Sequence, residues 1–209
     1  MTTTSLFSIF ADFHTEETEL DFGIIELQIP QINAVPIIWD LYLNVDNSAS
    51  MSDKCIDGRT KMHHIIHTIE NILRILAEHN EVEINICIKT FNTVVNTITD
   101  FVKLTPENLE NLIERVNKIR PNGSTNLVCS LMESKTILLD RQQQQQFPKH
   151  KQMHIQLTDG EDTVNRSKNA SIFIDSISDS YYNIFIGFGS SHDGYILGLL
   201  GDNKNCEYK

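Results

Sequence analysis

The sequence predicts an α/β fold, with a doubly wound, mostly parallel central sheet, one antiparallel edge strand and helices on both faces. Stretches with the pattern of strands alternate along the chain with stretches of helical period. Residues 37–45 form a mostly apolar run, as in a strand that is buried on both faces. That run ends abruptly in the polar residues 46–50, whose oxygens therefore lie beyond its carboxyl end, where sheets of this class bind ligands.

The other elements of this fold follow from their hydrophobic periods. Further strands are predicted at residues 83–91, 94–102, 153–157 and 182–188. The first two of these lie so close together that they should form an antiparallel hairpin at the sheet edge. Helices are predicted at residues 60–79, 105–119, 126–139, 167–178 and 192–200. The second of these helices begins with a hydroxyl cap at Thr105, followed by Pro106 and the acidic Glu107.

We expect one main domain at residues 37–209, preceded by an N-terminal extension at residues 1–36. Residues 22–29 alternate apolar and polar side chains, which predicts one added strand, either at the edge of the main sheet or within a preceding module. The glutamine-rich residues 141–151 cannot contribute to a core and are predicted to be a surface loop within the main domain.

Composition and charge restrict the partners and the compartment. The formal net charge of −11 argues against nucleic acid and anionic membranes as partners, because both bind clustered Lys and Arg. Four widely spaced cysteines predict free thiols, and the lack of a signal-peptide pattern or long apolar run predicts an intracellular protein. His63 and His67 are one helical turn apart, but no third ligand is evident, so solvent-facing histidines are favoured over a zinc site.

The oxygens beyond the first strand come from Asp46, Ser48 and Ser50, at alternate positions of one tight loop. A carboxylate and two hydroxyls suit a hard cation such as Mg²⁺, which prefers oxygen ligands and keeps several waters. The same residue types are common in helix caps, so this loop alone leaves both interpretations open. Two later segments add to it: residues 123–126, Gly-Ser-Thr-Asn, precede a helical pattern, and residues 157–161, Leu-Thr-Asp-Gly-Glu, close another apolar strand.

The order of these three segments resembles the von Willebrand factor A-type domain and its metal-ion-dependent adhesion site, carried on a Rossmann-like fold. The resemblance extends from about residue 37 to the end of the chain and includes lesser landmarks at residues 89–91 and 186–189. It implies a metal site formed by Asp46, Ser48, Ser50, Thr125 and Asp159. It also implies that the family's last strand and final helix would follow the end of this chain, so that the domain lacks both.

The resemblance also implies a role for each residue of the site. Ser48 and Ser50 would coordinate the ion directly, Thr125 directly or through water, and Asp46 and Asp159 largely through water and hydrogen bonds. Neutral hydroxyl ligands would leave Mg²⁺, or Mn²⁺ as its substitute, electron-poor, with one position free for an outside carboxylate.

The expected function is a metal-dependent protein-interaction module, not an enzyme, that binds an Asp or Glu side chain of a partner protein. An assembly role, with self-association in a larger protein, is the alternative. A Mg²⁺-dependent hydrolase is disfavoured, because the sequence offers no nucleophile-and-base set and no phosphate-binding glycine-rich loop. Ala49 stands where the family most often has Gly, which costs little unless the loop needs positive φ. Glu161 and Asp162 are expected to make the rim of the site acidic.

Overall fold

The structure is a computed structural model of the whole chain, and it describes residues 8–12, 24–28, 37–78, 82–144, 150–159, 162–165, 169–188 and 192–209. The chain divides into two compact units, Met1–Val35 and Pro36–Lys209. In the first unit, β1 (Ser8–Asp12) and β2 (Ile24–Gln28) pair antiparallel, with Ser8 opposite Gln28, as a two-stranded sheet of their own. The predicted strand at residues 22–29 is thus β2; its residues 22, 23 and 29 lie outside the described residues.

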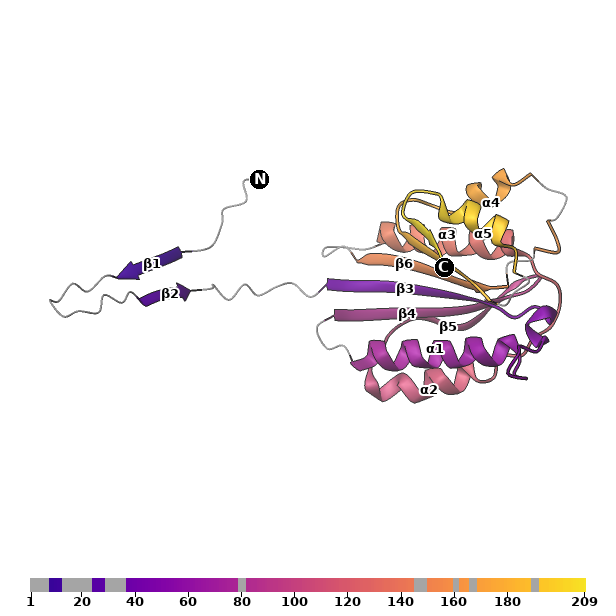
Figure 1. Cartoon of the computed structure of the whole chain (residues 1–209), viewed down its shortest axis with the longest axis horizontal. Coiled ribbons are helices and arrows are strands. Elements are labelled where there is room, and N and C mark those ends of the chain that lie inside the picture. The colour runs from indigo at the N-terminus through magenta and orange to yellow at the C-terminus, as the bar shows by residue number, and fades with distance from the viewer. Residues whose placement is uncertain are drawn as a thin grey trace. The chain divides into compact units, whose positions relative to one another are not determined.

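The second unit holds a six-stranded sheet with the strand order β5-β4-β3-β6-β7-β8 (Figure 1). All neighbouring strands are parallel except β4 and β5, which are antiparallel, so β5 is the antiparallel edge strand that the sequence predicts. The strands are β3 (Ile37–Asp46), β4 (Val82–Phe91), β5 (Val95–Lys103), β6 (Lys151–Thr158), β7 (Tyr182–Gly187) and β8 (Cys206–Tyr208). The short strand β8 was not among the predicted strands.

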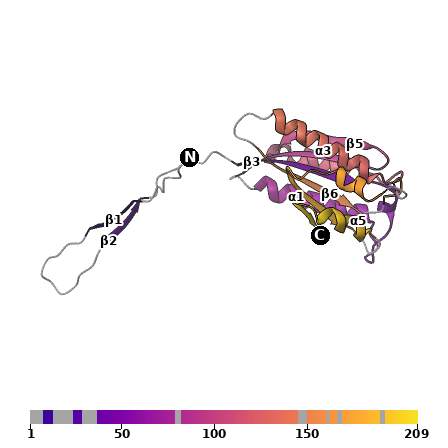
Figure 2. The ribbon, with the colours of Figure 1, turned by 90° about the horizontal axis from the view of Figure 1, so that it is seen from above.

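Helices cover both faces of this sheet, which confirms the predicted fold class. On one face lie α1 (Lys61–Glu78) and α2 (Pro106–Val116); on the other lie α3 (Leu127–Gln144), α4 (Ser171–Asp175) and α5 (Gly194–Gly201) (Figure 1). A turn of 3₁₀-helix, η1 (Ala49–Ser52), follows β3. In Figures 1 and 2, α1 and α3 run lengthwise along the strands. All five predicted helices are present; α4 is shorter than predicted, and His79 lies outside the described residues.

The two faces of the central strand β3 differ in polarity. Leu41, Leu43 and Val45 are buried with the apolar side chains of α1 and α2. The alternate positions, which face the α3 side, include Asn44, whose side chain donates to the backbone carbonyl of Ser130 on α3 (3.2 Å). A polar layer of this kind requires specific hydrogen bonds, so α3 has a fixed position over β3.

The chain order of the strands creates a switch point between β3 and β6. From β3 the chain builds outward through β4 to β5, and it later builds outward on the other side through β6 and β7 to β8. Val45 near the end of β3 lies opposite Leu157 near the end of β6. The residues that follow these two strands therefore meet at the crevice where open α/β sheets bind ligands.

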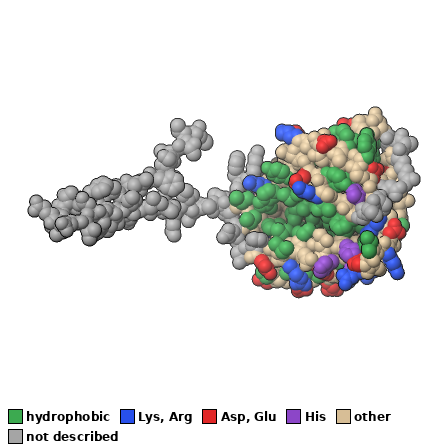
Figure 3. Space-filling model, in the orientation of Figure 1, with side chains coloured by type: hydrophobic (Ala, Val, Ile, Leu, Met, Phe, Trp, Pro, Cys, Tyr) green, Lys and Arg blue, Asp and Glu red, His purple; other side chains and the backbone are tan. Residues whose placement is uncertain are grey.

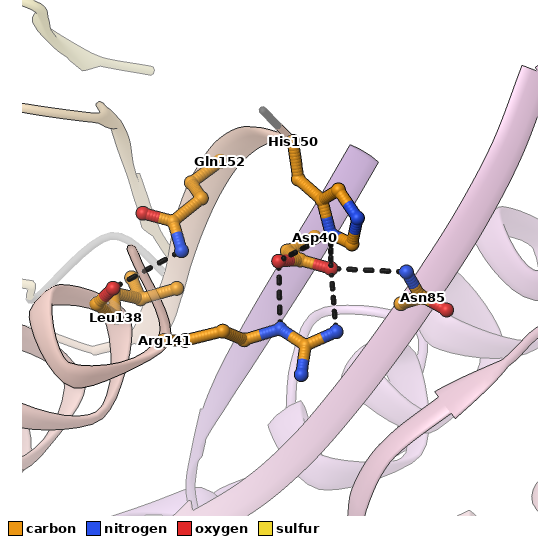
Figure 4. A network of polar contacts seen from close by, with 6 residues as sticks. All are labelled: Asp40, Asn85, Leu138, Arg141, His150 and Gln152. Carbon is orange, nitrogen blue, oxygen red and sulfur yellow. Dashed lines mark hydrogen bonds and ion pairs between the residues drawn. The ribbon is translucent and has the colours of Figure 1, made fainter. Parts of the chain in front are cut away.

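The glutamine-rich segment differs in part from the predicted surface loop. α3 continues through Gln144, and Arg141 in its last turn donates from Nε to Oδ2 of the fully buried Asp40 (2.6 Å). His150 and Asn85 contact the same carboxylate (Figure 4). An ion pair to a buried carboxylate of β3 extends the helix, and glutamines have a good helix propensity that the loop prediction neglected. Residues 145–149 lie outside the described residues.

A hollow of about 410 Å³ lies between α1 and the first halves of β3, β4 and β6. Its lining is apolar and includes Trp39, Leu41, Leu76 and Ile84. On the face shown in Figure 3, hydrophobic side chains gather over the strands. None of the helices in the described part of the chain is long and apolar enough to cross a membrane.

Candidate metal centre

The first loop of the candidate site is organised by the carboxylate of Asp46, the last residue of β3. Its Oδ1 accepts a hydrogen bond from the backbone N–H of Ser48 (2.8 Å), and its Oδ2 accepts one from the hydroxyl of Thr158 at the end of β6 (2.7 Å). The hydroxyls of Ser48 and Ser50 lie 3.0 Å apart. Asp46 and Ser48 are buried, whereas Ser50 is half-buried. Of the three candidate metal residues in this loop, Ser50 is therefore the one nearest to solvent.

Backbone hydrogen bonds tie the first loop to the second. The N–H of Asn122 donates to the carbonyl of Asn47 (2.7 Å), and the N–H of Ala49 donates to the carbonyl of Gly123 (3.0 Å). Gly123 has a φ of +72°, a conformation that glycine adopts without strain. Among the described residues, Asn205 is the only non-glycine residue with positive φ, so Ala49 fits its position as expected. The loop connection brings the segment containing Thr125 beside the serines.

Thr125 is buried and is held by its backbone to the segment after β6. Its N–H donates to the hydroxyl of Thr163 (2.9 Å), and its carbonyl accepts from the N–H groups of Thr163 (3.0 Å) and Val164 (3.2 Å). These bonds link the second loop to the third. Thr125 thus lies two residues before the start of α3, in a segment that is hydrogen-bonded to the loop after β3 and to the loop after β6.

Asp159 directly follows β6, and its two carboxylate oxygens have different surroundings. Oδ2 accepts a hydrogen bond from the ammonium of Lys61, the first residue of α1, at 3.1 Å. Oδ1 is buried and has no hydrogen-bond partner among the described residues. A buried carboxylate oxygen without a partner is costly, so this atom indicates a place for a cation or an ordered water.

The electrostatics of the site also favour a cation. Burial raises the pKa of Asp46 to about 6, although hydrogen bonds from Ser48 and Thr158 act to lower it. The negative charge of Asp159 contributes to the raised pKa of Asp46. Two buried carboxylates, with a single buried ammonium that is paired with Asp159, carry one unbalanced negative charge, which a bound cation would stabilise.

Asp162 does not have the predicted position on an acidic rim. Its side chain is buried, and its Oδ2 accepts from the N–H of Leu127, the first residue of α3 (3.0 Å). Its Oδ1 accepts from the N–H groups of Val164 (2.9 Å) and Asn165 (2.6 Å). A carboxylate that caps a helix N-terminus is satisfied locally and does not face a partner, so the prediction for Asp162 was wrong. Glu161 lies outside the described residues.

Sequence reasoning missed two residues at this site. Thr158 bonds Asp46 directly, and its hydroxyl beside Asp159 was the available signal. Lys61 gave no signal, because a lysine at the start of a helix ordinarily faces solvent.

His63 and His67 are exposed, in agreement with the prediction. Within the described ranges, His, Cys, Asp and Glu side chains do not gather in threes to hold a metal; the oxygens here come from two carboxylates and several hydroxyls.

Taken together, the fold and these loops define a doubly wound α/β domain with carboxylate and hydroxyl oxygens at the switch point of its sheet. The model of the von Willebrand factor type A domain matches residues 40–208, and the chain belongs to this family. A comparison with curated proteins gave no match.

Solved structures share the fold at low sequence identity. Manganese-loaded TRAP protein of Plasmodium vivax is 19% identical with a TM-score of 0.58, over 83% of this chain and 67% of that one. Proximal thread matrix protein 1 from the mussel byssus, in a structure with a zinc-occupied metal-ion-dependent adhesion site motif, is 15% identical with a TM-score of 0.62. That match covers 83% of this chain and 44% of the mussel protein. The PilB minor pilin of Streptococcus sanguinis is 15% identical with a TM-score of 0.58, over 99% and 74%.

Proposed function

We propose that this domain is a protein-interaction module that binds a partner through a divalent cation at the carboxyl edge of its sheet. The observation that carries the proposal is the buried Oδ1 of Asp159, which has no hydrogen-bond partner among the residues that the structure describes, and whose charge acts on Asp46. Asp46, Ser48, Ser50, Thr125 and Asp159 would hold the ion. Oxygen donors alone favour Mg²⁺, with Mn²⁺ as a substitute. Relatives of the same fold loaded with manganese and with zinc support a divalent ion in this family.

A bound ion would supply a Lewis-acidic position to which a carboxylate of another protein coordinates. The chain's own residues set where that position can be reached. Asp46 orients the first loop through its bonds to Ser48 and Thr158, and the half-buried Ser50 is the member nearest to solvent. We therefore propose that an Asp or Glu side chain of the partner approaches over Ser50. We favour an interaction module over a hydrolase, since Asp46 is held by hydrogen bonds from Ser48 and Thr158, and one oxygen of Asp159 is paired with Lys61.

Calorimetric titration with Mg²⁺ and Mn²⁺ of the wild-type chain and of Asp159→Ala tests the proposal. We expect binding in the wild type and a loss of at least about tenfold in affinity in the variant, because the unpartnered oxygen is removed. Asp179→Ala, which changes an exposed aspartate paired with Lys204, is the matched control and should bind like the wild type. Equal binding by wild type and Asp159→Ala would contradict the metal site.

The partner and the compartment are separate parts of the proposal. If the wild type binds the ion, capture of partners with Mg²⁺ and with chelator should differ, and Asp159→Ala should behave as the chelated protein. The four cysteines are free thiols, as the sequence predicts. An intracellular location stays a prediction.

A further inference from the structure

Lys61 is an unusual lysine, because it is buried beside the candidate metal centre. Its side chain is 8% exposed, and lysines are rarely buried to this degree unless they are paired. Its Nζ lies 3.1 Å from Oδ2 of Asp159 and 3.8 Å from Oδ2 of Asp53. The side chain of Asp53 is 68% exposed, so solvent screens that second contact and Asp159 is the principal partner.

The position of Lys61 is fixed by the fold and not by its side chain alone. It is the first residue of α1, and its backbone N–H donates to the carbonyl of Asp53 at 3.0 Å. A bridge between Lys54 and Thr60 closes the loop that precedes it. The connection from η1 into α1 therefore positions the ammonium of Lys61 beside Asp159.

This ammonium contacts Oδ2 of Asp159, whose Oδ1 has no hydrogen-bond partner in the part of the chain that the structure describes. A divalent ion held by Asp159 would meet a positive charge on the opposite side of the same group, and like charges repel strongly in a buried site. Apart from the exposed, solvent-screened Asp53, the local charges are two buried carboxylates, from Asp46 and Asp159, and one ammonium, which sum to −1. With a divalent ion the sum becomes +1; without Lys61 it would be zero. The lysine thus stabilises the ion-free site and opposes the loaded one.

We propose that the ammonium of Lys61 competes with the metal ion for Asp159. It neutralises this carboxylate when no ion is bound, and it thereby weakens the affinity of the site for divalent cations. This inference rests on the proposed function, since it concerns the same site. Lys61 would therefore have a regulatory role, because its charge keeps the affinity for the ion low. The loaded site would also keep a positive charge, which favours an anionic group of the partner.

The test is calorimetric titration of the full chain with Mn²⁺ and Mg²⁺, at one fixed pH and ionic strength, for wild type, Lys61→Met and Lys61→Arg. Removing the ammonium should lower the dissociation constant by about tenfold or more, whereas Lys61→Arg keeps the charge and should bind like the wild type. Lys89→Met is the matched control. Lys89 is a second buried lysine, paired with Asp100 at 2.9 Å, and its loss should leave metal affinity unchanged.

Thermal melts of the same proteins add a readout that does not require metal. In chelator, Lys61→Met should melt below the wild type, because Asp159 is left buried without its counter-charge. Added Mn²⁺ should raise the melting temperature of Lys61→Met more than that of the wild type. A smaller or equal rise in the variant would contradict the competition.

A wild-type measurement covers the case in which Lys61→Met does not fold. Amine acetylation followed by mass spectrometry should modify Lys61 faster in Mn²⁺ than in chelator, with the exposed Lys118 as the internal reference. Binding by the wild type with unchanged affinity in Lys61→Met, or with unchanged labelling of Lys61, overturns this inference and leaves the proposed function intact. Binding by Lys61→Met alone supports it, and binding by neither protein ends both proposals.

Discussion

At the scale of single residues, Gly123 is the backbone position that joins the first two loops of the candidate metal centre. Its φ of +72° lies in the left-handed region, and its carbonyl accepts the hydrogen bond from Ala49. A Cβ at this position would lie 3.4 Å from Cγ of Asn92, whose side chain bonds Asn122 in the same loop. A side chain here would therefore strain the backbone, and its Cβ would make ordinary van der Waals contact with Asn92.

We predict that Gly123→Ala destabilises the protein by about 1–2 kcal/mol, the cost of left-handed backbone in a residue with a Cβ. It should also weaken Mn²⁺ binding, because the Ala49 contact moves. Gly58→Ala is the matched control: Gly58 has a φ of +82° but open space around its Cβ position. Denaturant unfolding should show similar losses for the two variants, and calorimetry should show weaker metal binding for Gly123→Ala alone. Unchanged metal affinity in Gly123→Ala would show that the loop connection is dispensable.

A residue of the candidate site could be predicted from the sequence where it is a polar residue at the end of a predicted strand. Asp46 and Asp159 stand at the ends of apolar runs, so the sheet topology alone brings them together at one edge. Lys61 could not be predicted this way, because its contact with Asp159 spans 98 residues and depends on how α1 enters the fold. The same holds for Asp162, because the position of α3 sets where the N–H of Leu127 donates to its carboxylate.

At the scale of elements, Asp40 and Arg141 fasten the last turn of α3 to the beginning of β3. The guanidinium donates to Asp40 from Nε at 2.6 Å and from Nη2 at 2.9 Å, a bidentate arrangement (Figure 4). It also lies over the ring of Phe101, 4.2 Å from the ring centroid. Burial acts to raise the pKa of Asp40, but hydrogen bonds and charge from Arg141 outweigh it and hold the pKa below its ordinary value. The carboxylate is therefore more acidic in the folded chain than in the unfolded chain.

The sign of the resulting pH dependence follows from that lowered pKa. The stabilisation from Asp40 is present above the unfolded pKa of about 3.9 and is lost as the pH falls through the lower folded value. We predict that Asp40→Asn lowers the free energy of unfolding by about 2–3 kcal/mol at neutral pH, the loss of charged hydrogen bonds. The difference between variant and wild type should shrink below about pH 4, where Asp40 of the unfolded chain takes up a proton, and it should be lost below the lower folded pKa.

Urea unfolding of both proteins across the acid range measures this difference. Glu110→Gln is the control, since it removes an ion pair of Arg74 in which both side chains are exposed and should cost at most about 1 kcal/mol. A pH-independent gap between Asp40→Asn and wild type would show that the charge of Asp40 does not contribute.

Element boundaries could be predicted where hydrophobic period is strong, as in α1 and β4, whose observed ends lie within a residue or two of the expected ones. The extension of α3 depends on Arg141 reaching Asp40, 101 residues away, which no local pattern encodes. β8 has three residues, too few to show a period, and its pairing with β7 is supplied by the sheet. β1 also lacks a clear period and is fixed by pairing with β2.

At the scale of the whole molecule, the second unit contains all the parts on which the candidate function depends. This unit, Pro36–Lys209, includes the six-stranded sheet, the helices on both of its faces and the five candidate metal residues. The first unit consists of a separate two-stranded sheet, an arrangement that is marginally stable in isolation. The predicted division into an extension and a main domain, at residues 36 and 37, can therefore be tested by removing one part.

We predict that deletion of residues 1–35 leaves both the melting temperature and the Mn²⁺ dissociation constant of the main domain unchanged, because the core and the site lie within the second unit.

Deletion of residues 206–209 is the contrasting variant. It removes β8, the pairing of Cys206 with Asn183, and the backbone bonds between Lys209 and β7. That variant should melt at a lower temperature, because α5 loses the edge strand it packs on and Tyr208 leaves an apolar cluster. Differential scanning calorimetry of the three chains decides the matter: a marked loss of stability or of metal binding on removal of residues 1–35 would show that the extension is part of the folded domain.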